Sequence, residues 1–109
     1  MTAALRRIAA EARAWLLDAA YPFWFDKGIE PQHGGFVDFV DVDGSAVPGS
    51  PKRTVVQARQ IYAFAMAPRF GWTGRWRDAV ATGLETIDRH CRHPAGGFIH
   101  SLTRDNAPA

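Results

Sequence analysis

The residue with the clearest chemical potential is Arg59, a permanent cation inside an apolar stretch that runs from Lys52 to Phe70. Laid on a helix, the apolar positions of this stretch cover nearly the whole circumference, which is typical of a buried helix. A guanidinium in such surroundings needs carboxylates, carbonyls or ligand oxygens at its donors. The pattern therefore leaves two alternatives open, a polar ligand pocket or an internal salt bridge that fixes helix packing.

Groups that could hold a metal are arranged unfavourably. On a helix His90, Cys91 and His93 would point in different directions, and no ligand pair elsewhere completes a tetrahedral zinc site. Basic residues at these positions instead suit the C-terminal end of a helix, because the helix dipole favours positive charge there. The acidic run before Gly44 has Phe39 where a calcium loop needs an oxygen ligand, and it lacks the final glutamate. We therefore predict neither a metal nor a cofactor.

Composition limits the classes of function. A chain of 109 residues with 47% hydrophobic and 22% charged residues is expected to form one globular domain. The formal charge of +2 is small and the arginines are spread along the chain, which argues against a nucleic-acid partner. We expect no membrane partner, because there is no apolar run of about 18 residues, and no signal peptide, because Glu11, Arg13 and Asp18 interrupt the N-terminal apolar stretch. The single cysteine fits a reducing compartment, so we expect a cytoplasmic protein.

Helical periodicity predicts three helices, at about 2–25, 53–69 and 73–93. The first has Thr2 as its N-cap, and Pro22 should kink it or end it near Ala20, because proline lacks the backbone donor. The second is the apolar helix, which we expect to be the inner one. The third should begin at a Thr73 cap and bury a single face that includes Leu84. Both amphipathic helices are expected in an outer layer.

A repeated motif organises the rest of the chain. The Gly-Gly-Phe of residues 34–36 recurs at 96–98, an offset of 62 residues, and an Asp-Gly or Asp-Asn turn follows each copy. Each copy predicts a short β-hairpin, at about 36–48 and 97–105. The repeating unit is thus an inner helix, an outer helix and a hairpin. Units of this kind must stack to bury the inner helix, and a closed stack would form two concentric rings of helices around a cavity.

These features resemble the N-acylglucosamine 2-epimerases and their relatives, the cellobiose 2-epimerases, mannose isomerases and other aldose–ketose isomerases. The matching residues follow in order along the chain: Phe23-Trp24-Phe25, His33-Gly34-Gly35-Phe36, Asp43-Gly44, Lys52, Gln57-Ala58-Arg59-Gln60, Gly96-Gly97-Phe98, Leu102 and Asp105. The family folds as an (α/α)6 barrel. The resemblance implies that residues 1–109 are the N-terminal part of one such domain, a mostly α, incomplete (α/α)6 barrel.

The resemblance also implies an isomerase or epimerase that acts on a monosaccharide or disaccharide. Family members move a proton at C2 of the opened sugar through an enediolate, with histidines as acid and base and an arginine beside the sugar oxygens. Arg59 stands at the position of that arginine and is the expected catalytic residue. For substrate binding the resemblance suggests His100, Tyr62 and Gln57; a solvated strand position for the histidine and helix packing for the other two are the alternatives. The family's catalytic histidines lie on later helices, so we expect these 109 residues alone to be inactive.

Two other functions are conceivable. The chain could be a non-catalytic module that binds sugar or associates with itself through the uncovered wall of the inner helix, formed by Val56, Ile61, Phe64 and Met66. A glycoside hydrolase would need two carboxylates across a cleft. The aspartates of the first predicted hairpin lie too close together for that role, so we disfavour it.

Overall fold

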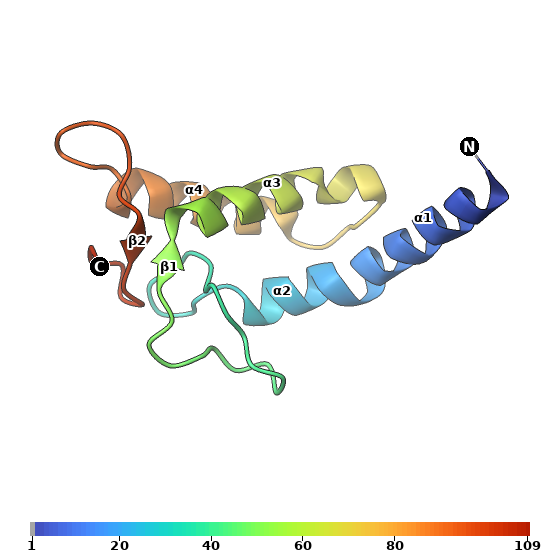
Figure 1. Cartoon of the computed structure of the whole chain (residues 1–109), viewed down its shortest axis with the longest axis horizontal. Helices are drawn as coiled ribbons and strands as arrows, with labels where there is room; N and C mark the ends of the chain where they lie inside the picture. Colours follow the sequence, from blue (N-terminus) through green and yellow to red (C-terminus); the bar gives the residue numbers. More distant parts are fainter. Residues whose placement is uncertain (1) are drawn as a thin grey trace.

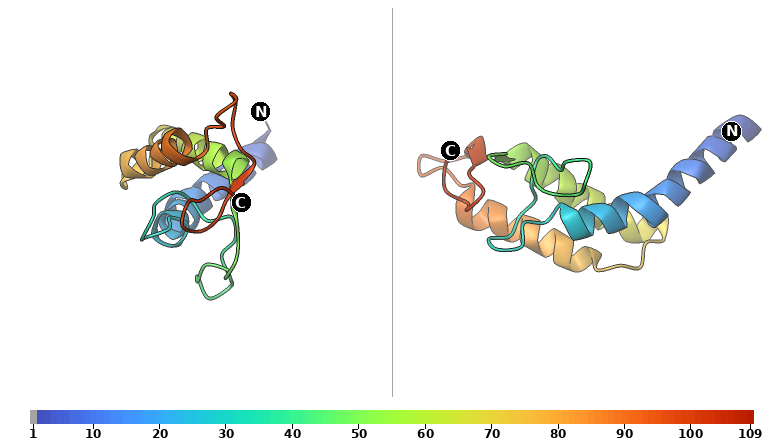
Figure 2. Two further views of the ribbon diagram at one scale, coloured as in Figure 1. Left: turned by 90° about the vertical axis from the view of Figure 1, so that its left-hand side faces the viewer. Right: turned by 90° about the horizontal axis from the view of Figure 1, so that it is seen from below.

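The computed structural model describes residues 2–109, which form helices and one small antiparallel sheet (Figure 1). In chain order the elements are α1 (Ala3–Trp15), the π-helical turn η1 (Leu16–Ala20), α2 (Tyr21–Lys27), β1 (Lys52–Arg53), α3 (Thr54–Phe70), α4 (Trp76–His90) and β2 (Ser101–Leu102). The described chain is elongated, 51 × 32 × 22 Å, because α1 extends away from the other helices (Figures 1 and 2). None of its helices is both long and apolar enough to cross a membrane.

The first predicted helix is continuous through α1, η1 and α2, but its hydrogen-bonding pattern changes part-way. The Thr2 hydroxyl accepts a hydrogen bond from the amide of Leu5 at 3.2 Å, which confirms the predicted N-cap. The wider π-helical turn ends just before the α2 residue Pro22. A local widening of this kind accommodates the proline ring and its missing donor. The predicted interruption near Ala20 is confirmed, although the chain stays helical beyond it.

Helix α1 belongs to the periphery, as predicted. None of its side chains is buried, and its apolar stripe stays open to solvent in the described chain: Leu5, Ile8 and Trp15 are 55%, 54% and 62% exposed. The stripe that periodicity reveals therefore has no covering element among residues 2–109.

Helix α3 is buried on one side only, so the prediction of a helix enclosed all round is wrong for this chain. Its inward face presents Gln57, Phe64 and Ala67, all buried. The opposite face is open, with Val55 45% and Tyr62 69% exposed. Figure 1 shows α3 lying against α4, with α2 below the pair. These elements cover one face of α3, and composition alone could not indicate which face that is.

An aromatic cluster joins α3 to its neighbours. The ring of Phe64 lies 5.7 Å from that of Phe36, 5.5 Å from Tyr21 and 5.8 Å from Trp72, measured between centroids. The Tyr21 hydroxyl also donates to the carbonyl of Ala63 at 2.8 Å, so its polar end is satisfied inside the core. Phe64 was predicted to lie on an uncovered wall; it is instead 1% exposed and central to the core.

Helices α3 and α4 pack closely because α4 presents small residues. Ala79, Gly83 and Thr86 are its buried residues. A Cβ atom at Gly83 would lie 2.5 Å from Cγ1 of Ile61, closer than any real contact, so only glycine fits here without a shift.

Two details of the third predicted helix are wrong. It begins at Trp76 with Arg75 at the cap position, so Thr73 is not its N-cap. Leu84 is 54% exposed, since the buried face is set by the close contact with α3 and not by the largest apolar residues of α4.

The predicted hairpins are wrong as regular strand pairs. The only extended ladder among the described residues joins the second copy of the motif to the segment just before α3: β1 pairs antiparallel with β2, with Lys52 opposite Leu102 and Arg53 opposite Ser101. Within each predicted hairpin only isolated bridges form, between residues 40 and 46 and between 102 and 108. Tight turns leave too few residues on each side for a strand.

The structure nevertheless confirms the repeat at an offset of 62 residues. The bridge between residues 40 and 46 recurs between 102 and 108. Inside each turn an amide donates to a carbonyl four residues later at 2.7 Å. The left-handed position of each turn holds Gly44, with φ 86°, or Asn106, with φ 65°, and these are residue types that adopt this conformation readily. The repetition thus extends from residue identity to backbone hydrogen bonding.

Candidate functional site

Arg59 lies on the open side of α3 and is exposed. Tyr62 follows three residues later on the same helix face, so the two side chains are neighbours on the surface. Within residues 2–109 the Arg59 guanidinium forms no ion pair or hydrogen bond, so the internal salt bridge considered above is not formed there. This face of α3 therefore offers a free cation beside a phenol hydroxyl.

Gln57 belongs to the interior and not to that face. It is fully buried, and its amide forms two hydrogen bonds with the backbone of Phe36: Oε1 accepts from the amide at 2.8 Å and Nε2 donates to the carbonyl at 2.6 Å. The side chain thus serves the backbone of the first Gly-Gly-Phe copy. This is the packing alternative, and we do not include Gln57 in the candidate site.

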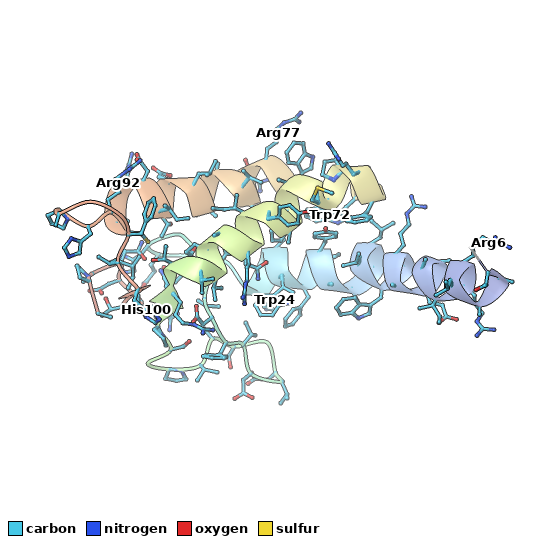
Figure 3. All side chains as sticks on the ribbon, turned by 45° about the horizontal axis from the view of Figure 1, so that its top comes forward. Arg6, Trp24, Trp72, Arg77, Arg92 and His100 are labelled. Atoms are coloured by element: carbon cyan, nitrogen blue, oxygen red, sulfur yellow. The ribbon has the colours of Figure 1, made fainter. Side chains whose placement is uncertain are left out.

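His100 lies near the first residues of α3, at the end of the molecule where the two sequence copies meet (Figure 3). Its carbonyl accepts a hydrogen bond from the amide of Thr54 at 2.9 Å, and its exposed ring contacts the hydroxyl of Ser101. The exposed ring agrees with the alternative interpretation of His100 as a solvated residue. The backbone contact ties the second copy to the start of α3.

A buried ammonium group lies behind this end of α3. Lys52 is 1% exposed; its Nζ donates to the carbonyl of Gly34 at 2.8 Å and to Oδ1 of Asn106 at 2.9 Å, and lies 3.8 Å from Oε2 of Glu30. Burial lowers the pKa of Lys52, while the nearby Glu30 carboxylate opposes that effect. The sequence marked Lys52 only as part of the resemblance, because its partners are distant along the chain.

Glu30 is the acidic partner in this buried cluster, and no local pattern distinguishes it. Burial raises its pKa, but hydrogen bonds from the amides of His33 and Gln32 and the charge of Lys52 prevail, so the pKa lies below its ordinary value. The second carboxylate oxygen, Oε1, has no hydrogen-bond partner in the described chain and lies 3.6 Å from Nε of Arg104. Glu30 is therefore held as a buried carboxylate between two cations.

Arg53, which lies between Lys52 and α3, is anchored as well. The fully buried carboxylate of Asp38 accepts a hydrogen bond from the backbone amide of Arg53 at 3.0 Å. The same carboxylate forms an ion pair with Nε of Arg53 at 2.5 Å. The Thr54 hydroxyl donates to the carbonyl of Ile99 at 2.6 Å. Successive residues at the start of α3 are thus tied to both copies of the motif.

The sequence of this chain matches the family described as N-acylglucosamine 2-epimerase (GlcNAc 2-epimerase) over residues 34–109. This span includes both Gly-Gly-Phe copies and Arg59. The chain belongs to this family. The chain is 45% identical over 94 residues to a mannose-6-phosphate isomerase from Rhizobium meliloti (strain 1021), a match that covers 86% of this chain and 24% of that protein.

Solved epimerases share the fold of this family member. Cellobiose 2-epimerase from Spirochaeta thermophila DSM 6192 superposes with a TM-score of 0.83 at 27% identity, covering 97% of this chain and 26% of its own. A sugar epimerase from a ruminal bacterium superposes with a TM-score of 0.80 at 21% identity, and the match covers 94% of this chain and 26% of that protein. The chain thus spans about a quarter of the length of these relatives.

Proposed function

We propose that this chain forms part of a sugar 2-epimerase or aldose–ketose isomerase, with an (α/α)6 barrel in the protein of full family length. Family membership supports the class of reaction, and two relatives, a cellobiose 2-epimerase and a mannose-6-phosphate isomerase, support a monosaccharide or disaccharide substrate. Because the chain spans about a quarter of these relatives, we assign turnover to a protein of their length.

The observation that carries the proposal is the free guanidinium of Arg59 on the open face of α3. When a base removes the proton at C2 of an opened sugar, negative charge moves onto the neighbouring carbonyl oxygen, and the enediolate forms. A fixed cation with forked donors stabilises that oxygen more strongly in the transition state than in the ground state. Arg59 would supply this charge. Histidines outside the matched positions of this chain would act as acid and base.

Two other residues would contribute to sugar binding. Tyr62, exposed on the same face of α3, would pack against the sugar or bond to one of its hydroxyls. His100 would extend the site from the start of α3, where its backbone is already fixed to Thr54. Both are proposed as binding residues and neither as the base.

The test is Arg59→Ala in a protein of the relatives' length that contains this chain, assayed for C2-epimer and aldose–ketose interconversion. We expect kcat to fall by about 10²-fold or more, because one electrostatic donor to a developing oxyanion is lost. Arg59→Lys should recover only part of this, since an ammonium does not reproduce the planar fork.

The matched control is Arg69→Ala, which removes another exposed arginine from the same helix. We expect this variant to retain its turnover. Unchanged kcat in Arg59→Ala, with sugar still converted, would remove Arg59 from the site and contradict the proposed role.

A further inference from the structure

The segment just before α3 is tied to both copies of the motif through Lys52. The buried Lys52 ammonium contacts the Gly34 carbonyl at 2.8 Å and the Asn106 side chain at 2.9 Å. Asn106 in turn donates through Nδ2 to the carbonyl of His33 at 2.8 Å. A single ammonium therefore joins the turn of the second copy to the Gly-Gly loop of the first, at the residue that opens β1 and lies two positions before α3.

The chemistry of this cluster requires a cation. The groups that face Lys52 Nζ are a backbone carbonyl, a side-chain carbonyl and the carboxylate of Glu30 at 3.8 Å. All of these are acceptors, and an ammonium offers three donors. An apolar side chain of similar length would leave the buried Gly34 carbonyl and Asn106 Oδ1 without this donor and the buried Glu30 carboxylate without this cation. The cluster is therefore specific for charge, although it lies away from the open face that carries Arg59.

We propose that Lys52 is a positioning residue, whose buried ammonium locks the two sequence copies together at the start of α3 and so directs Arg59 towards the sugar. This inference rests on the proposed function. Arg59 has a long side chain that residues 2–109 leave unpartnered, so its placement depends on the backbone from which it extends. Errors of about 1 Å in such placement cost on the order of 10²-fold in rate, and a supporting layer of fixed contacts prevents them.

The test is a double-mutant cycle between Lys52→Met and Arg59→Ala, in a protein of the relatives' length that contains this chain. Lys52→Met keeps the length of the side chain and removes its charge. Alone it should lower kcat by roughly 10- to 100-fold with little change in KM. In the Arg59→Ala background it should cause no further loss, because the group through which it acts is absent.

A matched control is Lys27→Met, which makes the same exchange at a lysine that is 48% exposed and outside the cluster. This control should leave kcat unchanged in both backgrounds. If Lys52→Met does not give a folded protein by circular dichroism and size-exclusion chromatography, Asn106→Gly replaces it in the cycle. Glycine keeps the left-handed backbone at this position, φ 65°, and removes the oxygen that accepts from Lys52.

The outcomes separate this inference from the proposed function. Equal losses in both backgrounds would show that Lys52 acts on folding alone and would overturn the inference, as would a folded Lys52→Met protein with unchanged kcat. In either case a low kcat in Arg59→Ala would leave the proposed function intact. Unchanged turnover in Arg59→Ala would instead overturn both.

Discussion

At the scale of single residues, the charged groups of this chain divide into two kinds. Arg59 is an exposed cation without a partner in the described chain, which suits a group that awaits a ligand. Glu30 and Lys52 are buried charges whose charged partners come from distant segments. A buried pair of this kind contributes little net stability compared with an apolar pair, but the loss of one partner is costly because the other charge remains buried.

The Glu30 carboxylate is therefore expected to make stability depend on pH. Its pKa in the fold lies below the ordinary 4.5, so the ionised form stabilises the fold above that value, and this contribution is lost as the pH falls through the lowered pKa. Glu30→Gln should reduce the free energy of unfolding by about 1–3 kcal/mol at neutral pH. Urea unfolding should show the difference from the parent chain shrinking as the pH falls below about 4.

Asp26→Asn provides the control for Glu30→Gln, since this carboxylate is 72% exposed. It should change stability little at any pH. A difference between Glu30→Gln and the parent chain that stays constant down to the acid end of the titration would contradict the assignment of an ionised, stabilising Glu30.

At the scale of elements, the contact between α3 and α4 depends on small residues. Ala79 and Gly83 let the two helix backbones approach, and the side chains of α3 fill the space between them. Close packing of this kind leaves little room for an added methyl group. The same contact decides which face of α3 is covered, and hence that Arg59 and Tyr62 remain on the open face.

Gly83→Ala tests this contact. Alanine favours a helix over glycine by about 1 kcal/mol, but its Cβ would lie 2.5 Å from Cγ1 of Ile61 and 3.1 Å from the ring of Phe36. Overpacking should prevail, with a net destabilisation of about 1–3 kcal/mol in chemical denaturation. In the Ile61→Ala background the added methyl should cost less or even stabilise. A single Gly83→Ala variant more stable than the parent would show that the helices separate easily.

At the scale of the whole molecule, the two ends of the chain differ in how they are held. The end with β1 and β2 is fixed by the buried cluster, which links the two copies, and by the pairing of β1 with β2. At the other end α1 extends away from the other helices (Figure 1). Its apolar stripe is uncovered among residues 2–109. Exposed stripes of this size favour association, and the chain spans only about a quarter of its relatives.

We therefore expect the 109-residue chain on its own to associate with itself through α1. Trp15 is 62% exposed and lines an apolar hollow with Phe23 and Trp24. Trp15→Glu should lower the apparent mass in light scattering after size exclusion, with little loss of stability, because no α1 side chain is buried. Ala10→Glu adds the same charge on the opposite face of α1 and should leave the apparent mass unchanged. A parent chain that is monomeric at high concentration would contradict this expectation.

Several features of this protein were determined by the sequence alone, because each depends on residues close together along the chain. The Thr2 cap, the interruption before Pro22 and the repeat with its turns at Gly44 and Asn106 are of this kind. Local backbone preferences and hydrogen bonds between residues close together in the sequence decide these features. The resemblance carried by Arg59 and its neighbours likewise indicated the family that the comparison confirmed.

Other features were decided only by the tertiary structure, since they depend on contacts between distant segments. A helix with apolar residues all round does not reveal which face will be covered, and α4 with the aromatic cluster covers the one with Phe64. Gln57 could have faced a cavity or the core. In the fold its side-chain amide forms two hydrogen bonds with the backbone of Phe36, which places it in the core. The buried cluster of Glu30 and Lys52 has no local signature, because long-range packing alone removes these charges from water and brings their partners together.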